Sequence, residues 1–184
     1  REDLPEVVSI SSGLGVRSTM NTNGGIKKAG LAEEDYFKQL AQRGLFGVHF
    51  SYDGIYPKND PRVIGLARYC LTTLHIYAGV RTVVTKDNLA VVENIGELCI
   101  ANSIFFQAVP AVAKDGVSSA SSDNFRPLDT DGWREYIAIN RRLSKVRGPF
   151  AKFLRMSEGY LKKVASAPNP ETAWHCKKLS AHQI

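Results

Sequence analysis

Short apolar runs that end in polar residues alternate with longer amphipathic segments, and this alternation constrains the fold more than any other feature of the chain. The apolar runs end near Thr22, Ser51, Thr85 and Gln107. Strands that alternate with helices in this way are typical of βαβ units, which build a parallel sheet with right-handed crossovers. The sequence therefore predicts an α/β fold, either an open doubly wound sheet or a barrel.

The segments between the apolar runs have the 3.6-residue spacing of amphipathic helices. The segment 31–43 also begins with acidic residues, which the helix dipole favours in a first turn, and Gly44 suits its end. The expected helices span 31–43, 60–75, 89–101, 130–145 and 150–164. The expected strands span 16–20, 45–50, 80–84 and 104–106.

The strand ends themselves are unusually polar and rich in glycine, as in "MNTNGG" at residues 20–25 and "SYDG" at residues 51–54. In both kinds of parallel fold, the loops after the carboxyl ends of the strands form the ligand site. Two interpretations stay open at this point. The glycines let backbone come close to a ligand, or they merely permit tight turns between strand and helix.

Composition and charge narrow the function classes. The chain has 43% hydrophobic and 23% charged residues, which is ordinary for a globular protein. Its net charge of +6 is spread along the chain, so no nucleic-acid-binding arm is evident. No stretch approaches the ~20 apolar residues of a membrane span, and no signal peptide is visible. Three widely spaced cysteines favour a reducing, cytoplasmic location over a disulfide framework.

Three stretches resemble one enzyme family. "TNGG" at residues 22–25, followed by "LAEEDYFKQLAQRGLFGVHFSYDG" at 31–54, resembles the third-to-fourth strand region of radical S-adenosylmethionine (radical SAM) enzymes. "VRTVVTKDN" at 80–88 is similar to the fifth strand of that family. "WHCKK" at 174–178 resembles the start of the SPASM or twitch extension, which carries auxiliary iron-sulfur clusters. The resemblance covers about residues 4–176 and implies a (β/α) TIM-type barrel with parallel strands.

The chain departs from the family in two respects. The C-x-x-x-C-x-x-C motif that binds the catalytic 4Fe-4S cluster is absent from the sequence given, and so is the G-G-E-type turn after the second strand. We therefore expect residues 1–147 to form a partial barrel that lacks its first two strands. Residues 148–184 would form a C-terminal helix and the start of a possible auxiliary-cluster extension. The fragment as given would be inactive.

The resemblance also implies an activity. The complete enzyme would cleave S-adenosylmethionine reductively and use the resulting 5'-deoxyadenosyl radical on an unknown substrate, either a small molecule or a peptide. Its cofactors would be S-adenosylmethionine and a 4Fe-4S cluster, whose ligands are not in this chain. An electron donor for the cluster would be its protein partner.

The family motifs assign roles to particular residues. Ser51 would contact the carboxylate or ribose region of S-adenosylmethionine. Asp53 would shape the turn, and direct contact with the ligand is the less favoured alternative. Thr22 and Asn23 would face the cavity that holds cofactor or substrate. Cys176 would be the first ligand of an auxiliary cluster.

The region of the fourth expected strand would contact the adenine. Gln107 to Val109 would lie along the adenine and would contact it mainly through their backbone groups. Two further residues have two interpretations each. Arg81 either binds an anionic group or pairs with a core carboxylate. Asn88 either caps a helix or binds the ligand. Cys70 and Cys99 are expected to be buried as small hydrophobes on helices.

Two other functions remain open. A complete lyase or aldolase on a (β/α) scaffold would use Lys86 as Schiff-base former, although a lysine needs a desolvated pocket for that role. A non-catalytic α/β binding module, pairing with another chain, is the other alternative.

Overall fold

The computed structural model describes residues 3–24, 32–54, 62–111 and 126–145, and these build one parallel sheet with five helices. In chain order the elements are α1 (Leu4–Gly13), β1 (Thr19–Thr22), α2 (Glu33–Gln42), β2 (Gly47–Ser51), α3 (Arg62–Thr72), β3 (Tyr77–Val84), α4 (Leu89–Ala101), β4 (Phe105–Pro110) and α5 (Thr130–Lys145). The predicted α/β class and the parallel sheet are confirmed.

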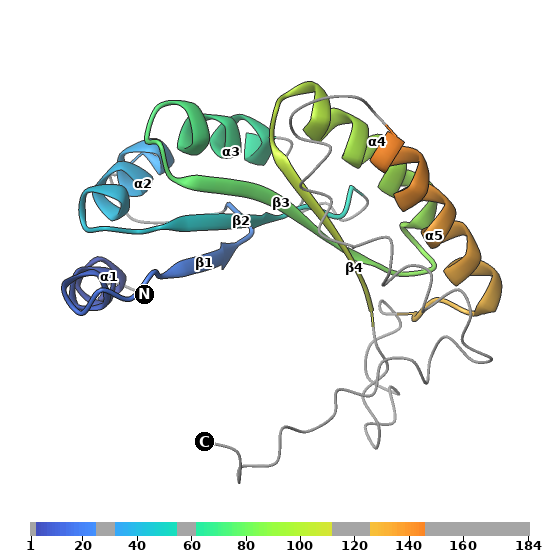
Figure 1. The fold of residues 1–184 in the computed structure, drawn as a ribbon, viewed down its shortest axis with the longest axis horizontal. Helices are drawn as coiled ribbons and strands as arrows, with labels where there is room; N and C mark the ends of the chain where they lie inside the picture. Colours follow the sequence, from blue (N-terminus) through green and yellow to red (C-terminus); the bar gives the residue numbers. More distant parts are fainter. Residues whose placement is uncertain (1–2, 25–31, 55–61, 112–125, 146–184) are drawn as a thin grey trace, which may run out of the picture.

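The strands follow one another in the sheet in the order of the chain, β1-β2-β3-β4, and every neighbouring pair is parallel. The strand order does not reverse among the described strands, so right-handed crossovers place the connecting helices on one face of the sheet. Figure 1 shows α2, α3, α4 and α5 along the outer side of the curved sheet. The described part is therefore wound in one direction, unlike a doubly wound sheet.

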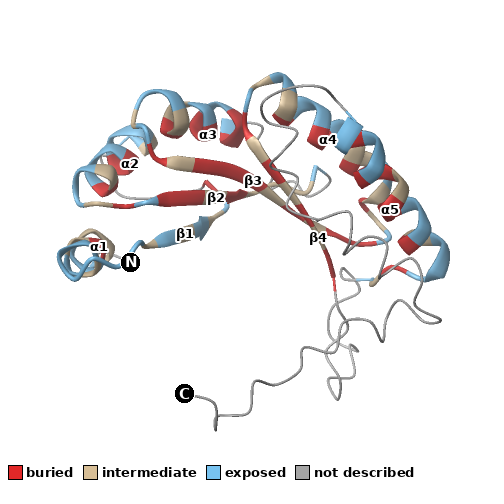
Figure 2. Cartoon of the chain, in the orientation of Figure 1, coloured by how far each residue is buried: buried red, intermediate tan, exposed pale blue. Residues whose placement is uncertain are grey.

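The core lies between these helices and the sheet face that they cover (Figure 2). Phe37 of α2 packs edge-to-face on Phe50 of β2 with ring centroids 5.3 Å apart. At the other end, the buried hydroxyl of Tyr136 on α5 donates to the carbonyl of Ala108 at 3.0 Å. The strand residues of the covered face are Val48, Phe50, Ala78, Val80, Thr82, Val84, Phe106, Ala108 and Pro110.

The other face of the sheet carries the alternate strand residues, because successive side chains in a strand point to opposite faces. None of the described helices α2 to α5 packs its buried residues on this face, and we call it the uncovered face. Its residues include Asn21, His49, Ser51, Tyr77, Arg81, Val83, Phe105, Gln107 and Val109. Apart from exposed Asn21, these residues are half-buried.

Helix bounds were predicted better than strand bounds. The predictions for α4 and α5 are confirmed at both ends, and α2 and α3 lie within the expected segments. The strand expected over 16–20 was placed too early, since Val16 is exposed and β1 begins at Thr19. The expectation that the fourth strand ends near Gln107 was wrong. β4 continues to Pro110, because its residues alternate between the two faces and Gln107 is one of the outward positions.

The glycines after β1 and β2 serve the packing of helices. Gly24 has φ = 79°, and a Cβ there would lie 2.7 Å from Val63 of α3. Gly54 also has φ = 79°, and its Cβ would lie 3.0 Å from Ile95 of α4. These contacts favour the turn interpretation of the two glycines, since the close approach is to a helix.

The two cysteines on helices are buried, as predicted. Cys70 on α3 and Cys99 on α4 have no exposed surface, and burial raises the pKa of each thiol to about 12. Cys176 and the whole of 148–184, including the expected helix 150–164, lie outside the described residues. No helix in the described ranges is long and apolar enough to cross a membrane.

Candidate functional site

A row of three polar residues crosses the uncovered face. Ser51 ends β2 and is in register with Arg81 of β3, which is in register with Gln107 of β4. Neighbouring strands lie about 4.8 Å apart, and residues in register share a face, so a hydroxyl, a guanidinium and an amide are adjacent. Ser51 and Gln107 were predicted site residues, and the fold brings them onto one face with Arg81 between them.

A second row follows one step toward the carboxyl ends of the strands. Val83 and Val109 are in register there. Asp53 joins them from beyond β2, where its Oδ1 accepts a hydrogen bond from the Val83 N–H at 3.2 Å. The chain between Ser51 and Asp53 is tied to β3 as well, because Tyr52 N–H donates to the Arg81 carbonyl at 3.2 Å. The prediction that Asp53 shapes this turn agrees with these bonds.

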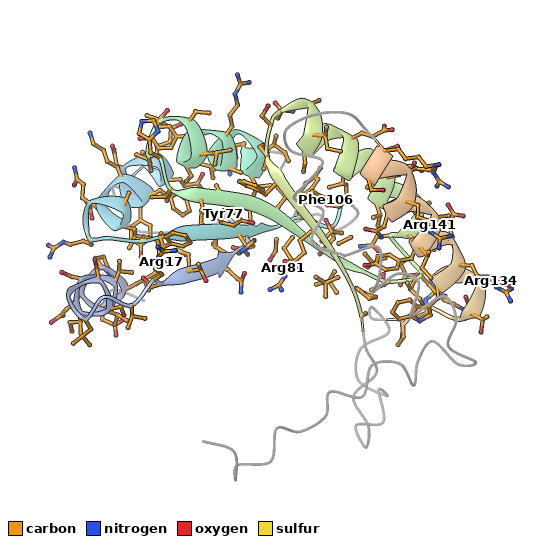
Figure 3. All side chains as sticks on the ribbon, in the orientation of Figure 1. Arg17, Tyr77, Arg81, Phe106, Arg134 and Arg141 are labelled. Carbon is orange, nitrogen blue, oxygen red and sulfur yellow. The ribbon has the colours of Figure 1, made fainter. Side chains whose placement is uncertain are left out.

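Arg81 has no ion-pair partner in the part of the chain that the structure describes. Its Nε is buried and has no hydrogen-bond acceptor among the described residues. Figure 3 shows the side chain on the side of the sheet away from α3 and α4, whereas Arg134 and Arg141 lie on the outer side of α5. Of the two readings for this residue, the ion pair with a core carboxylate is therefore not found among the described residues.

An aromatic row lies on the same face nearer the amino ends of the strands. His49 packs edge-to-face on Tyr77 with ring centroids 5.3 Å apart, and Tyr77 stacks on Phe105 at 4.6 Å. Along the strands, this face therefore has bulky aromatic side chains toward the amino ends and polar side chains toward the carboxyl ends. A ligand that contacts the polar row would have this aromatic row beside it.

The remaining predicted site residues are not part of either row. Thr22 is in register with Phe50, which places it on the helix-covered face, and its hydroxyl accepts a hydrogen bond from Gly24 N–H at 3.1 Å. The expectation that the Thr22 side chain faces the cavity was therefore wrong, because strand alternation turns it toward the helices. Asn23 is exposed just beyond β1.

The turn after β3 is held by structural bonds. The buried Asn88 accepts from Thr85 N–H and donates to the Val83 carbonyl, each at 2.8 Å. Asn88 therefore closes the turn and makes no side-chain cap to α4. Both readings given for Asn88, a helix cap and a ligand contact, are replaced by this role.

Lys86, the residue of the Schiff-base alternative, is in an environment unsuited to that role. Its Nζ lies 2.6 Å from Oδ2 of Asp129, and its side chain is 42% exposed. A Schiff-base lysine needs a desolvated site that lowers its pKa. The exposed ion pair argues against a lyase that uses Lys86.

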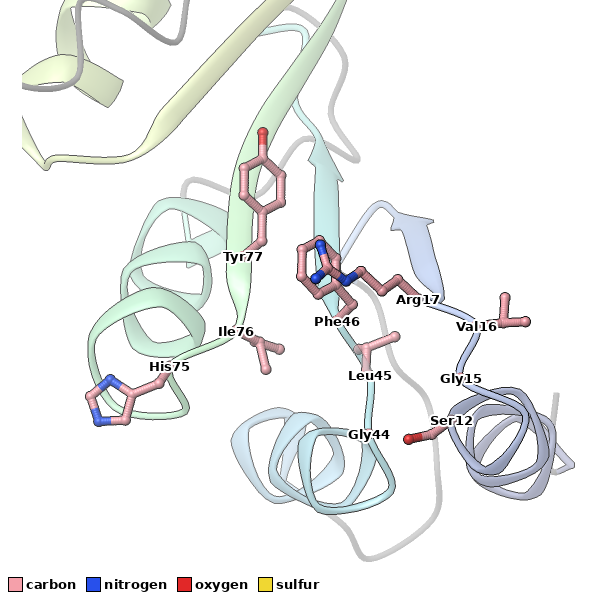
Figure 4. A pocket seen from close by; sticks show the side chains of 10 residues that line it. All are labelled: Ser12, Gly15, Val16, Arg17, Gly44, Leu45, Phe46, His75, Ile76 and Tyr77. Carbon is pink, nitrogen blue, oxygen red and sulfur yellow. The ribbon is translucent and has the colours of Figure 1, made fainter.

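A cavity of about 380 Å³ lies at the opposite end of the strands. Figure 4 shows it beside Gly44, Leu45 and Ile76, with the guanidinium of Arg17 over the ring of Phe46, 5.0 Å from its centroid. This is the amino-terminal end of the sheet, where residues of parallel α/β folds usually serve stability. We therefore assign the candidate site to the uncovered face and not to this cavity.

The residues present set limits on cofactors. The hydroxyl, the amide and the guanidinium of the polar row, whose Nε has no acceptor among the described residues, have the hydrogen-bonding chemistry for the amino-acid and nucleoside groups of S-adenosylmethionine. An iron-sulfur cluster needs several thiolates, and the buried thiols of Cys70 and Cys99 do not fit that role. Across the described ranges, no three His, Cys, Asp or Glu side chains gather as a metal site.

No protein-family model and no curated protein matches the chain.

Proposed function

We propose that this chain is the carboxyl-terminal part of a radical SAM enzyme barrel, and that the uncovered face is the interior of that barrel. The complete enzyme would cleave S-adenosylmethionine reductively and act on a small-molecule or peptide substrate. The one-directional sheet with its helices on a single face supports this proposal, because a barrel needs that winding. The observation that carries it is the polar row Ser51, Arg81 and Gln107 on the face without helices.

The residues of the two rows would bind and orient the cofactor. The Ser51 hydroxyl would hydrogen-bond the carboxylate or ribose region, and the backbone from Gln107 to Val109 would lie along the adenine. Asp53 would hold the turn that carries Ser51 in place through its bond to Val83 N–H. The bound S-adenosylmethionine would supply the radical chemistry, and these residues would position it and exclude water.

The buried thiols of Cys70 and Cys99 do not fit the catalytic cluster, and under this proposal its ligands would come from sequence upstream. Strand-helix units of ~28 residues would place a C-x-x-x-C-x-x-C motif within about 100 residues upstream. Reading the genomic frame upstream tests this at once. A frame that contains no such motif would remove the radical SAM proposal and favour a non-catalytic binding module.

Binding of S-adenosylmethionine tests the site directly. We expect the chain to bind the compound in equilibrium dialysis, and Ser51→Ala to weaken binding about tenfold through the loss of one hydrogen bond to a charged group. Ser144→Ala is the matched control, since Ser144 lies exposed on α5 and its hydroxyl donates to the Arg141 carbonyl. Equal affinity of the wild type and Ser51→Ala would contradict the proposed role of Ser51.

A further inference from the structure

We propose that Arg81 is the binding residue for an oxyanion, a carboxylate or a phosphate of a small molecule, on the uncovered face of the sheet. The anion would lie between the side chains of Ser51 and Gln107, which flank Arg81 in register. The existence of this anion site does not depend on radical chemistry. Only its use by the substrate or cofactor of a radical SAM enzyme rests on the proposed function.

The present arrangement of Arg81 costs free energy. Arg81 is in the third of four strands, so its backbone is fixed by β2 on one side and β4 on the other. Its Nε is buried without an acceptor in the part of the chain that the structure describes. A buried donor without a partner costs about 1–3 kcal/mol, and more when it is charged. An acceptor that binds from the open side of the sheet would remove this cost.

The side chains beside Arg81 are chemically suited to an anion. A guanidinium presents its N–H groups in a planar fork that matches a carboxylate or phosphate. The Ser51 hydroxyl and the Gln107 amide add neutral donors on either side of that fork. None of the three groups brings a negative charge, and no carboxylate among the described residues pairs with Arg81. The Asp53 carboxylate lies in the next row, where it accepts a hydrogen bond from Val83 N–H. Three donor groups without an acid in their own row favour an anionic ligand.

The position of the row in the sheet also suits a ligand. The row is level with the last residue of β2, near the carboxyl ends of the strands where parallel α/β folds bind ligands. The aromatic row of His49, Tyr77 and Phe105 borders the polar row on the side of the strands' amino ends. An anionic head group on Arg81 would thus have an apolar surface beside it for the rest of the molecule.

The test follows the Nε–H signal of Arg81 by nuclear magnetic resonance in the chain labelled with ¹⁵N at arginine Nε. Inorganic phosphate, succinate and S-adenosylmethionine are titrated separately. We expect at least one probe to shift this signal, and the probe identifies the source: phosphate, a substrate-like carboxylate, or the cofactor carboxylate. Loss of the signal in Arg81→Lys assigns it. No shift with any probe at tens of millimolar would overturn the proposal.

Affinity gives the second measurement. We expect Arg81→Gln to weaken binding of the active probe at least about tenfold. The affinity of Arg81→Lys should lie between those of the wild type and Arg81→Gln, since lysine keeps the charge but lacks the planar fork of N–H groups. Arg141→Gln removes the same charge from the exposed face of α5 and should leave affinity unchanged. An equal loss in Arg81→Gln and Arg141→Gln would mean general charge attraction and would overturn the site.

The outcomes separate the two proposals. A response to phosphate or succinate without binding of S-adenosylmethionine supports the anion site and contradicts the radical SAM function. The opposite outcome is that S-adenosylmethionine binds in a way that depends on Ser51, while no probe shifts the Arg81 signal. This outcome supports the radical SAM function and contradicts the anion site.

Discussion

The carboxylate of Asp53 accepts a hydrogen bond at 3.2 Å from the backbone N–H of Val83, and so extends the pairing of β2 and β3 beyond the end of β2. We expect Asp53→Ala to lower the free energy of unfolding by about 1 kcal/mol, the usual worth of one hydrogen bond. Asp53→Asn keeps an acceptor oxygen and should lose less. Urea denaturation measures both variants.

The same pair of variants separates a structural role from a ligand contact. We expect Asp53→Asn to bind S-adenosylmethionine nearly as well as the wild type, while Ser51→Ala does not. A variant Asp53→Ala of unchanged stability that no longer binds the compound would show that the carboxylate contacts the ligand instead.

Gly24 is expected to be the least replaceable described glycine at a strand end. Its φ of 79° strains any L side chain, and an added Cβ would lie 2.7 Å from Val63. We expect Gly24→Ala to cost about 2 kcal/mol or more. Gly65→Ala is the contrasting control, because an added methyl meets nothing within 4 Å and a helix interior gains about 0.5–1 kcal/mol from the change. Thermal unfolding of the two variants should therefore shift in opposite directions.

The sequence predicted the helices well because their signals are local. The segments of α4 and α5 carry apolar residues at regular helical spacing, and both bounds were predicted from that spacing. Strand ends depend on which neighbours a residue meets across the sheet. Gln107 was interpreted as a terminator because it is polar, but it is an outward residue of a strand that continues to Pro110.

The candidate site was predicted only in part, because only some of its signals are local in the sequence. Ser51 and Gln107 were identified from family motifs, and the alternation of Val80, Arg81 and Thr82 could have identified Arg81 as facing the opposite side from the core. The contact of Gly24 with Val63 and the bond of Asp53 to Val83 join residues distant in sequence. Only the folded register brings such pairs together, so spacing along the chain could not predict them.

Cys70 and Cys99 should resist alkylation in the native chain. The reactive form of a cysteine is its thiolate. Burial raises the pKa of both thiols to about 12, so at pH 8 about one in ten thousand is ionised. We expect iodoacetamide at pH 8 to leave both unmodified, and to label both once the chain is unfolded in guanidinium. Peptide mass spectrometry measures this, and rapid labelling of either residue in the native chain would contradict its burial.

The segment before α5 should detach from the β3–α4 turn in acid. Arg126 hydrogen-bonds Asp87, and Lys86 hydrogen-bonds Asp129, and these bonds hold the pKa of each carboxyl below its usual value of 3.8. A lowered pKa stabilises the docked state above the ordinary carboxyl pKa, and this contribution is lost as the pH falls through the lowered values. Both pairs are exposed, so salt should weaken them as well.

The backbone bond from Lys86 N–H to the Arg126 carbonyl, 3.0 Å long, reports on this docking. We expect the hydrogen-exchange protection factor of the Lys86 amide to keep its full value above about pH 5 and to fall below pH 4. The Leu89 amide, which donates to the Thr85 carbonyl at 3.1 Å within the same turn, is the internal control and should keep its protection. A parallel loss at both amides would mean that the whole turn unfolds in acid, and would contradict selective release by the two ion pairs.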